Sequence, residues 1–410
     1  MLEIEIVKSK KSYAHGRILK ILSPSPNRLR PHCVYAGRCG GCSWQHCDYA
    51  AQLNFKKQIV IDALERIGGI SNPPVFDIIG MESPWNYRNK GIFPIAAQGR
   101  GFVMGMYEPH SHKIVDLRCC LIQHPAHEAI LQAMDGFLCK HPILARKMLD
   151  VMVRVGFATG DIMAVVSVQG DFTEENGLAA ELAAAGATTV ILNRPSFQGR
   201  RRKDNYRTLH GTGYITEIIN GISYRISAAS FFQVNPIQAK ILFDTALSYA
   251  ALSGSQTIID AHCGTGSMTL YAARHAKSAI GIDTASSSIR DAQKNAALNG
   301  IKNTRFINAA AETAMPKLLQ AESPNVVFLD PPKAGCGEAL ISSLIASAPP
   351  QIIYISCDPA TFARDIKQLA QGGYSPEAVQ PVDMFPMTAH VEIVASLRHS
   401  NAYKPSKEEH

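Results

Sequence analysis

No stretch of this sequence is apolar over the roughly 18 residues that a membrane-spanning helix requires. The first residues, Met1 to Ile6, include two glutamates and lack the basic and apolar pattern of a signal peptide. We also find no internal repeat. The sequence therefore predicts a cytoplasmic protein that does not enter a membrane, and it gives no sign of an obligate protein partner.

Charge is also sparse, because charged residues make up only 18% of the 410 residues while hydrophobic residues make up 46%. This composition is typical of a folded chain, and the length suits two or three domains. Lysine and arginine outnumber the acids, which gives a net charge of +7. A basic balance favours an acidic partner such as nucleic acid.

The ten cysteines are unevenly distributed. In a cytosolic chain, clustered cysteines indicate a metal or catalytic site before they indicate disulfides. Cys33, Cys39 and Cys42 place three thiols on a glycine-containing turn, and Cys119 or Cys120 offers a fourth. Four thiolates suit either a zinc ion or a [4Fe–4S] cluster, and the spacing alone leaves both open.

The rhythm of the sequence changes near residue 237. Before it, residues 49–68 have helical periodicity, and residues 75–230 mix short β-type runs with an alanine-rich helix near 176–186. After it, apolar strands alternate with helices, which predicts a parallel, doubly wound sheet. The expected strands are 257–261, 278–283, 305–308, 325–330 and 351–356, with further strands at 376–384 and 391–397. We therefore expect an α/β protein with a Rossmann-like domain at 237–410, after a central α+β domain at 31–236 and a basic strand-like segment at 1–30.

A glycine-rich loop follows the first of these strands, in Asp260-Ala-His-Cys-Gly-Thr-Gly266. Gly264 and Gly266 allow a tight turn and let a ligand approach the backbone. The next strand ends at Asp283, whose carboxylate is placed to accept hydrogen bonds from ribose hydroxyls. The loop lacks the full G-x-G-x-x-G pattern, so it favours S-adenosylmethionine over NAD.

Two further strands end in residues suited to chemistry. Asp330 ends the fourth strand before two prolines, and Lys333 stands where enzymes that methylate amino groups of bases usually have an aromatic residue. Cys357 follows the fifth strand at the same sheet edge. Carbon 5 of uracil is a weak nucleophile, and a thiolate that adds to carbon 6 would activate it. Cys357 is therefore the candidate covalent nucleophile.

Such a reaction needs a base to remove the carbon-5 proton after methyl transfer. His390 and Glu392 are the candidates, and Glu392 is favoured because it begins an apolar strand. Gln233, in Ser230-Phe-Phe-Gln-Val-Asn235, is a candidate for hydrogen bonds to the cofactor or the base. The basic run 200–203 and Arg207 are candidates for phosphate contacts.

Together these stretches resemble the RNA 5-methyluridine methyltransferase family, and within it the iron–sulfur branch that acts on 23S ribosomal RNA. The resemblance covers nearly the whole chain and includes Tyr87-Arg-Asn-Lys90 and Gln45-His46. It implies Cys357 as the nucleophile and Glu392 as the base. The cofactor positions that it implies are Gln233, His262, Asp283 and Asp330, and the [4Fe–4S] ligands are Cys33, Cys39, Cys42 and Cys120.

The sequence departs from the family pattern at several places. His262 replaces an aromatic residue, Asp283 replaces glutamate, Asp358 replaces asparagine and Lys333 replaces arginine. Residues 1–30 would form only a partial remnant of the family's RNA-binding β-barrel. The alternatives are the same reaction on tRNA, or a non-catalytic RNA-binding assembly factor. A cysteine-dependent DNA cytosine methyltransferase would usually carry a Pro-Cys pair after the fourth strand, which this sequence lacks.

Overall fold

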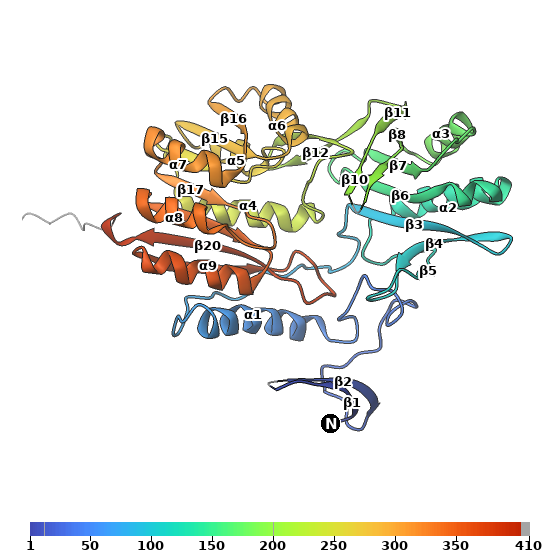
Figure 1. The fold of residues 1–410 in the computed structure, drawn as a ribbon, viewed down its shortest axis with the longest axis horizontal. Helices are drawn as coiled ribbons and strands as arrows, with labels where there is room; N and C mark the ends of the chain where they lie inside the picture. Colours follow the sequence, from blue (N-terminus) through green and yellow to red (C-terminus); the bar gives the residue numbers. More distant parts are fainter. Residues whose placement is uncertain (12, 200, 403–410) are drawn as a thin grey trace, which may run out of the picture.

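The computed structural model describes residues 1–11, 13–199 and 201–402. Among these residues, two seven-stranded sheets contain most of the strands, and three two-stranded ribbons contain the rest. Figure 1 shows the two large sheets side by side, with the N-terminal ribbon set apart from both of them.

The C-terminal sheet has the strand order β16-β15-β14-β17-β18-β20-β19, in which the first five strands are parallel. β20 runs antiparallel to β18, and β19 runs antiparallel to β20. The strands are β14 (Thr257–Asp260), β15 (Ser278–Asp283), β16 (Thr304–Asn308), β17 (Val326–Leu329), β18 (Gln351–Ser356), β19 (Tyr374–Val382) and β20 (Glu392–His399). The Rossmann-like α/β sheet predicted from the sequence is therefore confirmed.

Helices cover both faces of this sheet, which explains why its strands are apolar along their whole length. In β17, for example, all four residues Val326–Leu329 are buried. One face packs on α4, α5 and α6, and the other packs on α7, α8 and α9. These helices are α4 (Pro236–Ala250), α5 (Ser267–Ala273), α6 (Ser286–Leu298), α7 (Ala311–Glu322), α8 (Glu338–Ser347) and α9 (Pro359–Gln371).

The central sheet has the order β11-β8-β7-β6-β3-β4-β5 and is antiparallel except for the β7–β8 pair. Its strands are β3 (Lys90–Gln98), β4 (Gly101–Tyr107), β5 (Ile114–Asp116), β6 (Met148–Val155), β7 (Ile162–Val168), β8 (Thr189–Asn193) and β11 (Tyr206–His210). Two helices, α2 (Ala126–Lys140) and α3 (Glu175–Ala184), pack on it through a separate apolar core, with a short 3-10 helix at Pro142–Arg146.

Two ribbons follow the central sheet in the sequence. β9 (Ser196–Gln198) pairs with β10 (Arg201–Lys203), and β12 (Tyr214–Ile219) pairs with β13 (Ile222–Ser227). The second ribbon contributes Ile215 and Tyr224 to the core under the C-terminal sheet. It therefore connects the two large sheets.

Helix α1 (Tyr49–Arg66) begins where the Asp48 carboxylate accepts a hydrogen bond from the backbone N–H of Ala51 at 3.2 Å. Val60 and Leu64 on this helix are buried in the core that also contains residues of α9 and β19. A helix from the first quarter of the chain thus packs on the C-terminal sheet (Figure 1). The domain boundaries given above stay a prediction.

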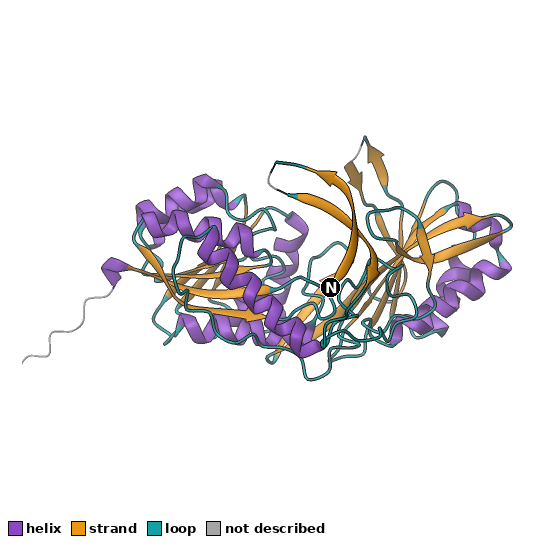
Figure 2. Ribbon diagram, turned by 90° about the horizontal axis from the view of Figure 1, so that it is seen from below, coloured by secondary structure: helices purple, strands orange, loops and turns teal. Residues whose placement is uncertain are grey.

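The N-terminal ribbon consists of β1 (Leu2–Ser9) and β2 (Ala14–Ile21), and nearly all its residues are exposed. Figure 1 shows it below the rest of the molecule, and Figure 2, seen from below, shows it in front of the middle of the molecule. Its relation to an RNA-binding barrel stays a prediction. No helix in the described ranges has the length and apolar character needed to cross a bilayer.

Candidate active site

A cavity of about 1270 Å³ lies at the carboxyl ends of β14, β17 and β18 and extends to the cysteine-rich segment. Ligands of open parallel sheets bind at this edge. The residues that the sequence analysis favoured for catalysis, cofactor binding and metal binding line this cavity, whereas the alternative metal ligand Cys119 does not. The favoured residues are Cys33, Cys39, Cys42, Cys120, Gln233, His262, Gly264, Asp283, Asp330, Cys357 and Glu392.

The glycine-rich loop is held by the next strand. Gly264 and Gly266 have φ values of +53° and +84°, in the left-handed region that glycine adopts most readily. The Gly264 N–H donates to Asp283 Oδ2 at 3.0 Å, and the Ala285 N–H donates to Asp283 Oδ1 at 2.7 Å. Each carboxylate oxygen keeps a further lone pair, so Asp283 can still accept hydrogen bonds from ribose hydroxyls.

His262 presents a buried polar atom that nothing in the described chain satisfies. Its Nδ1 is buried and has no hydrogen-bond partner among these residues. Burial lowers the pKa of His262, which favours the neutral ring. Buried polar atoms are rarely left unpaired, so a polar atom of a cofactor fits this position.

Two carboxylates lie beneath the same part of the cavity. Asp260 is 1% exposed and accepts a hydrogen bond from Thr269 Oγ1 at 2.6 Å. Burial raises the pKa of Asp260 to about 6, and burial together with Asp260 raises the pKa of Asp330 to about 7. A cation beside these groups would lower both pKa values, so this part of the cavity suits a positively charged ligand.

Cys357 and Glu392 lie on adjacent strands. β18 and β20 pair antiparallel up to Ser356 opposite Ile393, and continuing this register places Cys357 opposite Glu392. Burial raises the pKa of Cys357 to about 11, with smaller contributions from Glu392 and Asp330. Glu392 is 6% exposed, and burial followed by Asp330 raises its pKa well above the usual range. The thiol and the carboxyl group therefore form a compact, mutually repelling pair when both are ionised.

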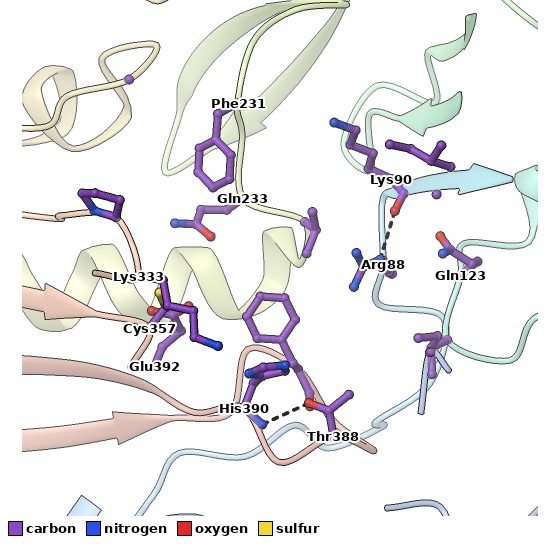
Figure 3. Close-up of a pocket in the computed structure, with 18 of the residues that line it drawn as sticks. Arg88, Lys90, Gln123, Phe231, Gln233, Lys333, Cys357, Thr388, His390 and Glu392 are labelled. Atoms are coloured by element: carbon purple, nitrogen blue, oxygen red, sulfur yellow. Dashed lines mark hydrogen bonds between the residues drawn. The ribbon is translucent and has the colours of Figure 1, made fainter. Parts of the chain in front are cut away.

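Figure 3 shows further side chains around this pair. Gln233 points into the cavity, and the exposed ring of Phe231 lies beside it. Phe232 instead belongs to the core, at 3% exposed. His390, the other candidate base, is exposed, and desolvation and Lys333 lower its pKa.

The cysteine-rich segment forms the far wall of the cavity. Cys33, Cys39, Cys42 and Cys120 all line it, whereas Cys119 does not. Within the described ranges, no three side chains of histidine, cysteine, aspartate or glutamate are gathered tightly enough to hold a metal ion. Burial raises the pKa values of Cys39, Cys42 and Cys120, and nearby thiols contribute to each increase.

The site also contains residues to which the sequence analysis assigned no role. Arg88, Lys90 and Gln123 line the cavity. By contrast, Arg202 pairs with Asp150 and Asp204, and Arg207 pairs with Glu175, so acids on β6, after β10 and on α3 already balance these two charges. Arg200 lies outside the described residues.

The chain is similar to known RNA methyltransferases. A family model described as tRNA (Uracil-5-)-methyltransferase matches residues 48–399. An uncharacterized RNA methyltransferase of Caldanaerobacter subterraneus subsp. tengcongensis is 41% identical over 404 residues, which cover 96% of this chain and 89% of that protein. An uncharacterized RNA methyltransferase of Bacillus cereus is 39% identical over 408 residues, which cover 97% of this chain and 89% of that protein.

The fold is similar to the crystal structure of the Pyrococcus abyssi tRNA (uracil-54, C5)-methyltransferase in complex with S-adenosyl-L-homocysteine. The TM-score is 0.76 at 24% identity, and the match covers 96% of this chain and 91% of that chain. At this level of identity the likeness shows a shared fold.

Proposed function

The chain belongs to the RNA uracil-5-methyltransferase family, whose members use S-adenosylmethionine, and we propose that it methylates a uridine of 23S ribosomal RNA through a covalent adduct on Cys357. The observation that carries the proposal is the position of Cys357 opposite Glu392, in the cavity that also contains the glycine-rich loop. Methylation of an amino group of a base would need neither a covalent thiol nor a base that removes a proton from carbon.

S-adenosylmethionine, when bound, supplies an electrophilic methyl group on a sulfonium cation. We propose that Asp283 accepts hydrogen bonds from its ribose hydroxyls and that Gly264 lets it approach the backbone. His262 Nδ1 and the side chain of Gln233 supply further polar contacts. Asp330, whose pKa is raised to about 7 by burial and by Asp260, favours the cation.

The proposed chemistry begins when the Cys357 thiol gives its proton to water and its sulfur adds to carbon 6 of the uracil ring. The displaced electron pair makes carbon 5 nucleophilic enough to take the methyl group, and the rest of the methyl donor leaves as S-adenosylhomocysteine. Glu392 then removes the proton from carbon 5, and the electron pair left behind expels the sulfur of Cys357. The raised pKa of Glu392 suits it to accept that proton.

Carbon 6 is inaccessible in a stacked base. We therefore propose that the target uridine is unstacked and enters the cavity from a loop or a folded single strand. The mild positive charge of the chain, +7, is consistent with an RNA substrate in the cytoplasm.

A [4Fe–4S] cluster on Cys33, Cys39, Cys42 and Cys120 is also part of the proposal. Two observations support this ligand set: the four thiols line one wall, and the Gly41 N–H donates to Cys39 Sγ at 3.4 Å. The sulfurs are not gathered into a compact group, so the cluster would have to draw the segment together. Its role would be to fix this segment, and the methyl transfer itself needs no electron from it.

The test is to map 5-methyluridine in 23S rRNA and tRNA from a strain that lacks this protein. Loss of a 5-methyluridine from 23S rRNA alone is the expected result. Loss from tRNA alone would overturn the assignment to ribosomal RNA and favour the tRNA alternative. If the purified protein with S-adenosylmethionine methylated neither RNA, a non-catalytic assembly role would replace the proposal.

A further inference from the structure

We propose that Arg88, Lys90 and Gln123 form a second subsite of the cavity, which binds the phosphate and base of an RNA nucleotide beside the target uridine. This inference rests on the proposed function, since it assumes that the RNA reaches Cys357 through this cavity. Figure 3 shows the three side chains across the cavity from Cys357.

The backbone holds these residues together. The Arg88 N–H donates to Ile122 O at 2.8 Å, and the His124 N–H donates to Arg88 O at 3.0 Å, so Arg88 and Gln123 form a short parallel bridge. Arg88 Nε donates to Lys90 O at 3.0 Å. The subsite is therefore built from two segments that are far apart in sequence and fixed to each other.

The charge of this wall favours an anion. Among the described residues, neither Arg88 nor Lys90 forms an ion pair with an acid. Beneath them, Arg154 is 1% exposed, and its guanidinium donates to Ser227 O at 3.2 Å and to Ser230 O at 3.0 Å. Burial lowers the pKa of Lys90 to about 8, and the neighbouring Arg154 and Arg88 add to this effect. A phosphate would neutralise this group of cations.

Gln123 adds a specific polar contact. It is 2% exposed, and neither its Nε2 nor its Oε1 has a hydrogen-bond partner in the described part of the chain. A paired donor and acceptor of this kind match the edge of a nucleobase. The unpaired amide next to uncompensated cations therefore points to a nucleotide as the ligand and disfavours a simple inorganic anion.

Gln123 also follows Cys120, the proposed fourth cluster ligand, by three residues, and its N–H donates to Cys120 O at 3.1 Å. Any group that fixes Cys120 would fix Gln123 as well. The subsite thus gives the cysteine-rich segment a role in shaping the RNA-binding wall.

The test compares Arg88→Gln, Lys90→Gln and Gln123→Met with the matched control Lys277→Gln, which changes an exposed lysine outside the cavity. The probe is 23S rRNA transcribed in vitro, and its affinity is measured over a range of salt concentrations. Each cation variant should weaken binding about 5–10-fold and reduce the slope of log K against log salt by about 0.7, the value for one phosphate contact on a single strand. The control should match the wild type.

Gln123→Met should weaken RNA binding about tenfold without changing the salt slope. It should leave the melting temperature of the free protein unchanged or raised, because it removes an unpaired buried amide. A lower melting temperature with unchanged RNA affinity would make Gln123 a structural residue and overturn its part in the subsite.

Two further measurements separate this inference from the proposed function. All variants should bind S-adenosylhomocysteine as the wild type does, and the wild type should form a Cys357 adduct with 23S rRNA that contains 5-fluorouridine. If the wild type forms the adduct while Arg88→Gln and Lys90→Gln bind RNA normally, the subsite is wrong and the proposed function stands. If the wild type neither binds this RNA nor forms the adduct, both are wrong.

Discussion

Lys56 Nζ lies 2.5 Å from Asp383 Oδ1, and both side chains are fully buried. Lys56 is on α1, and Asp383 directly follows β19. The other oxygen of Asp383 accepts a hydrogen bond from Tyr49 Oη at 2.8 Å, and Lys56 Nζ also donates to Phe385 O at 3.0 Å. This pair therefore anchors the loop that leads to Glu392.

Replacing Lys56 with methionine should destabilise the protein by about 3–5 kcal/mol, because the substitution leaves a buried carboxylate without its cationic partner. Urea denaturation followed by circular dichroism measures this change. Lys57→Met is the control, since the neighbouring Lys57 pairs with the exposed Asp77, and this variant should unfold at the wild-type midpoint. Equal midpoints for the two variants would show that the buried pair contributes no stability.

The cysteine-rich wall gives a second prediction. Protein purified without air should be brown, with broad absorbance near ~400 nm. It should contain about four iron atoms per chain. Cys33→Ser, Cys39→Ser, Cys42→Ser and Cys120→Ser should each lose this absorbance. Cys119→Ser should keep it, because Cys119 does not line the cavity. Stoichiometric zinc without iron, measured by elemental analysis, would show that the metal assignment is wrong.

A third prediction follows from the environment of Cys357. Its pKa is raised to about 11 by burial first and then by Glu392 and Asp330, so the thiol is mostly protonated in the free enzyme at neutral pH. Alkylation by iodoacetamide requires the thiolate, so the rate at Cys357 should rise about tenfold per pH unit between about pH 7 and pH 9. Peptide mass spectrometry resolves this cysteine from the other nine.

Glu392→Gln provides the control for that experiment. Removing the Glu392 carboxylate should lower the pKa of Cys357 and speed its alkylation at any pH at which Glu392 is ionised, because a negative charge disfavours the thiolate. A rate that levels off below about pH 9 in the wild type would contradict the raised pKa.

The sequence predicted the Rossmann-like sheet well because its strands are apolar, short and regularly spaced. The expected strands at 278–283 and 351–356 agree with β15 and β18 at both ends. Motifs at strand ends also identified residues that meet in one cavity, since parallel strands bring their carboxyl ends to the same edge.

Local sequence patterns could not predict which strands pair when they are far apart in the sequence. The adjacency of β18 and β20, which sets Cys357 opposite Glu392, depends on an antiparallel strand that returns from the end of the chain. The burial of Lys56 was likewise hidden, because a lysine on an amphipathic helix usually faces solvent. The sequence did not indicate a role for Gln123, because the only feature that suggests one is the buried, unpaired amide seen in the structure.

The most direct test of the central claim compares Cys357→Ala with Glu392→Gln in a reaction with S-adenosylmethionine and 23S rRNA. On a denaturing gel, Glu392→Gln should retain RNA covalently joined to Cys357, with turnover reduced by roughly 10²–10⁴-fold, the usual contribution of a general base. Cys357→Ala should give neither an adduct nor methylated RNA. Full methylation by Cys357→Ala, or an adduct that mass spectrometry locates on Cys263 or Cys336, would contradict the mechanism.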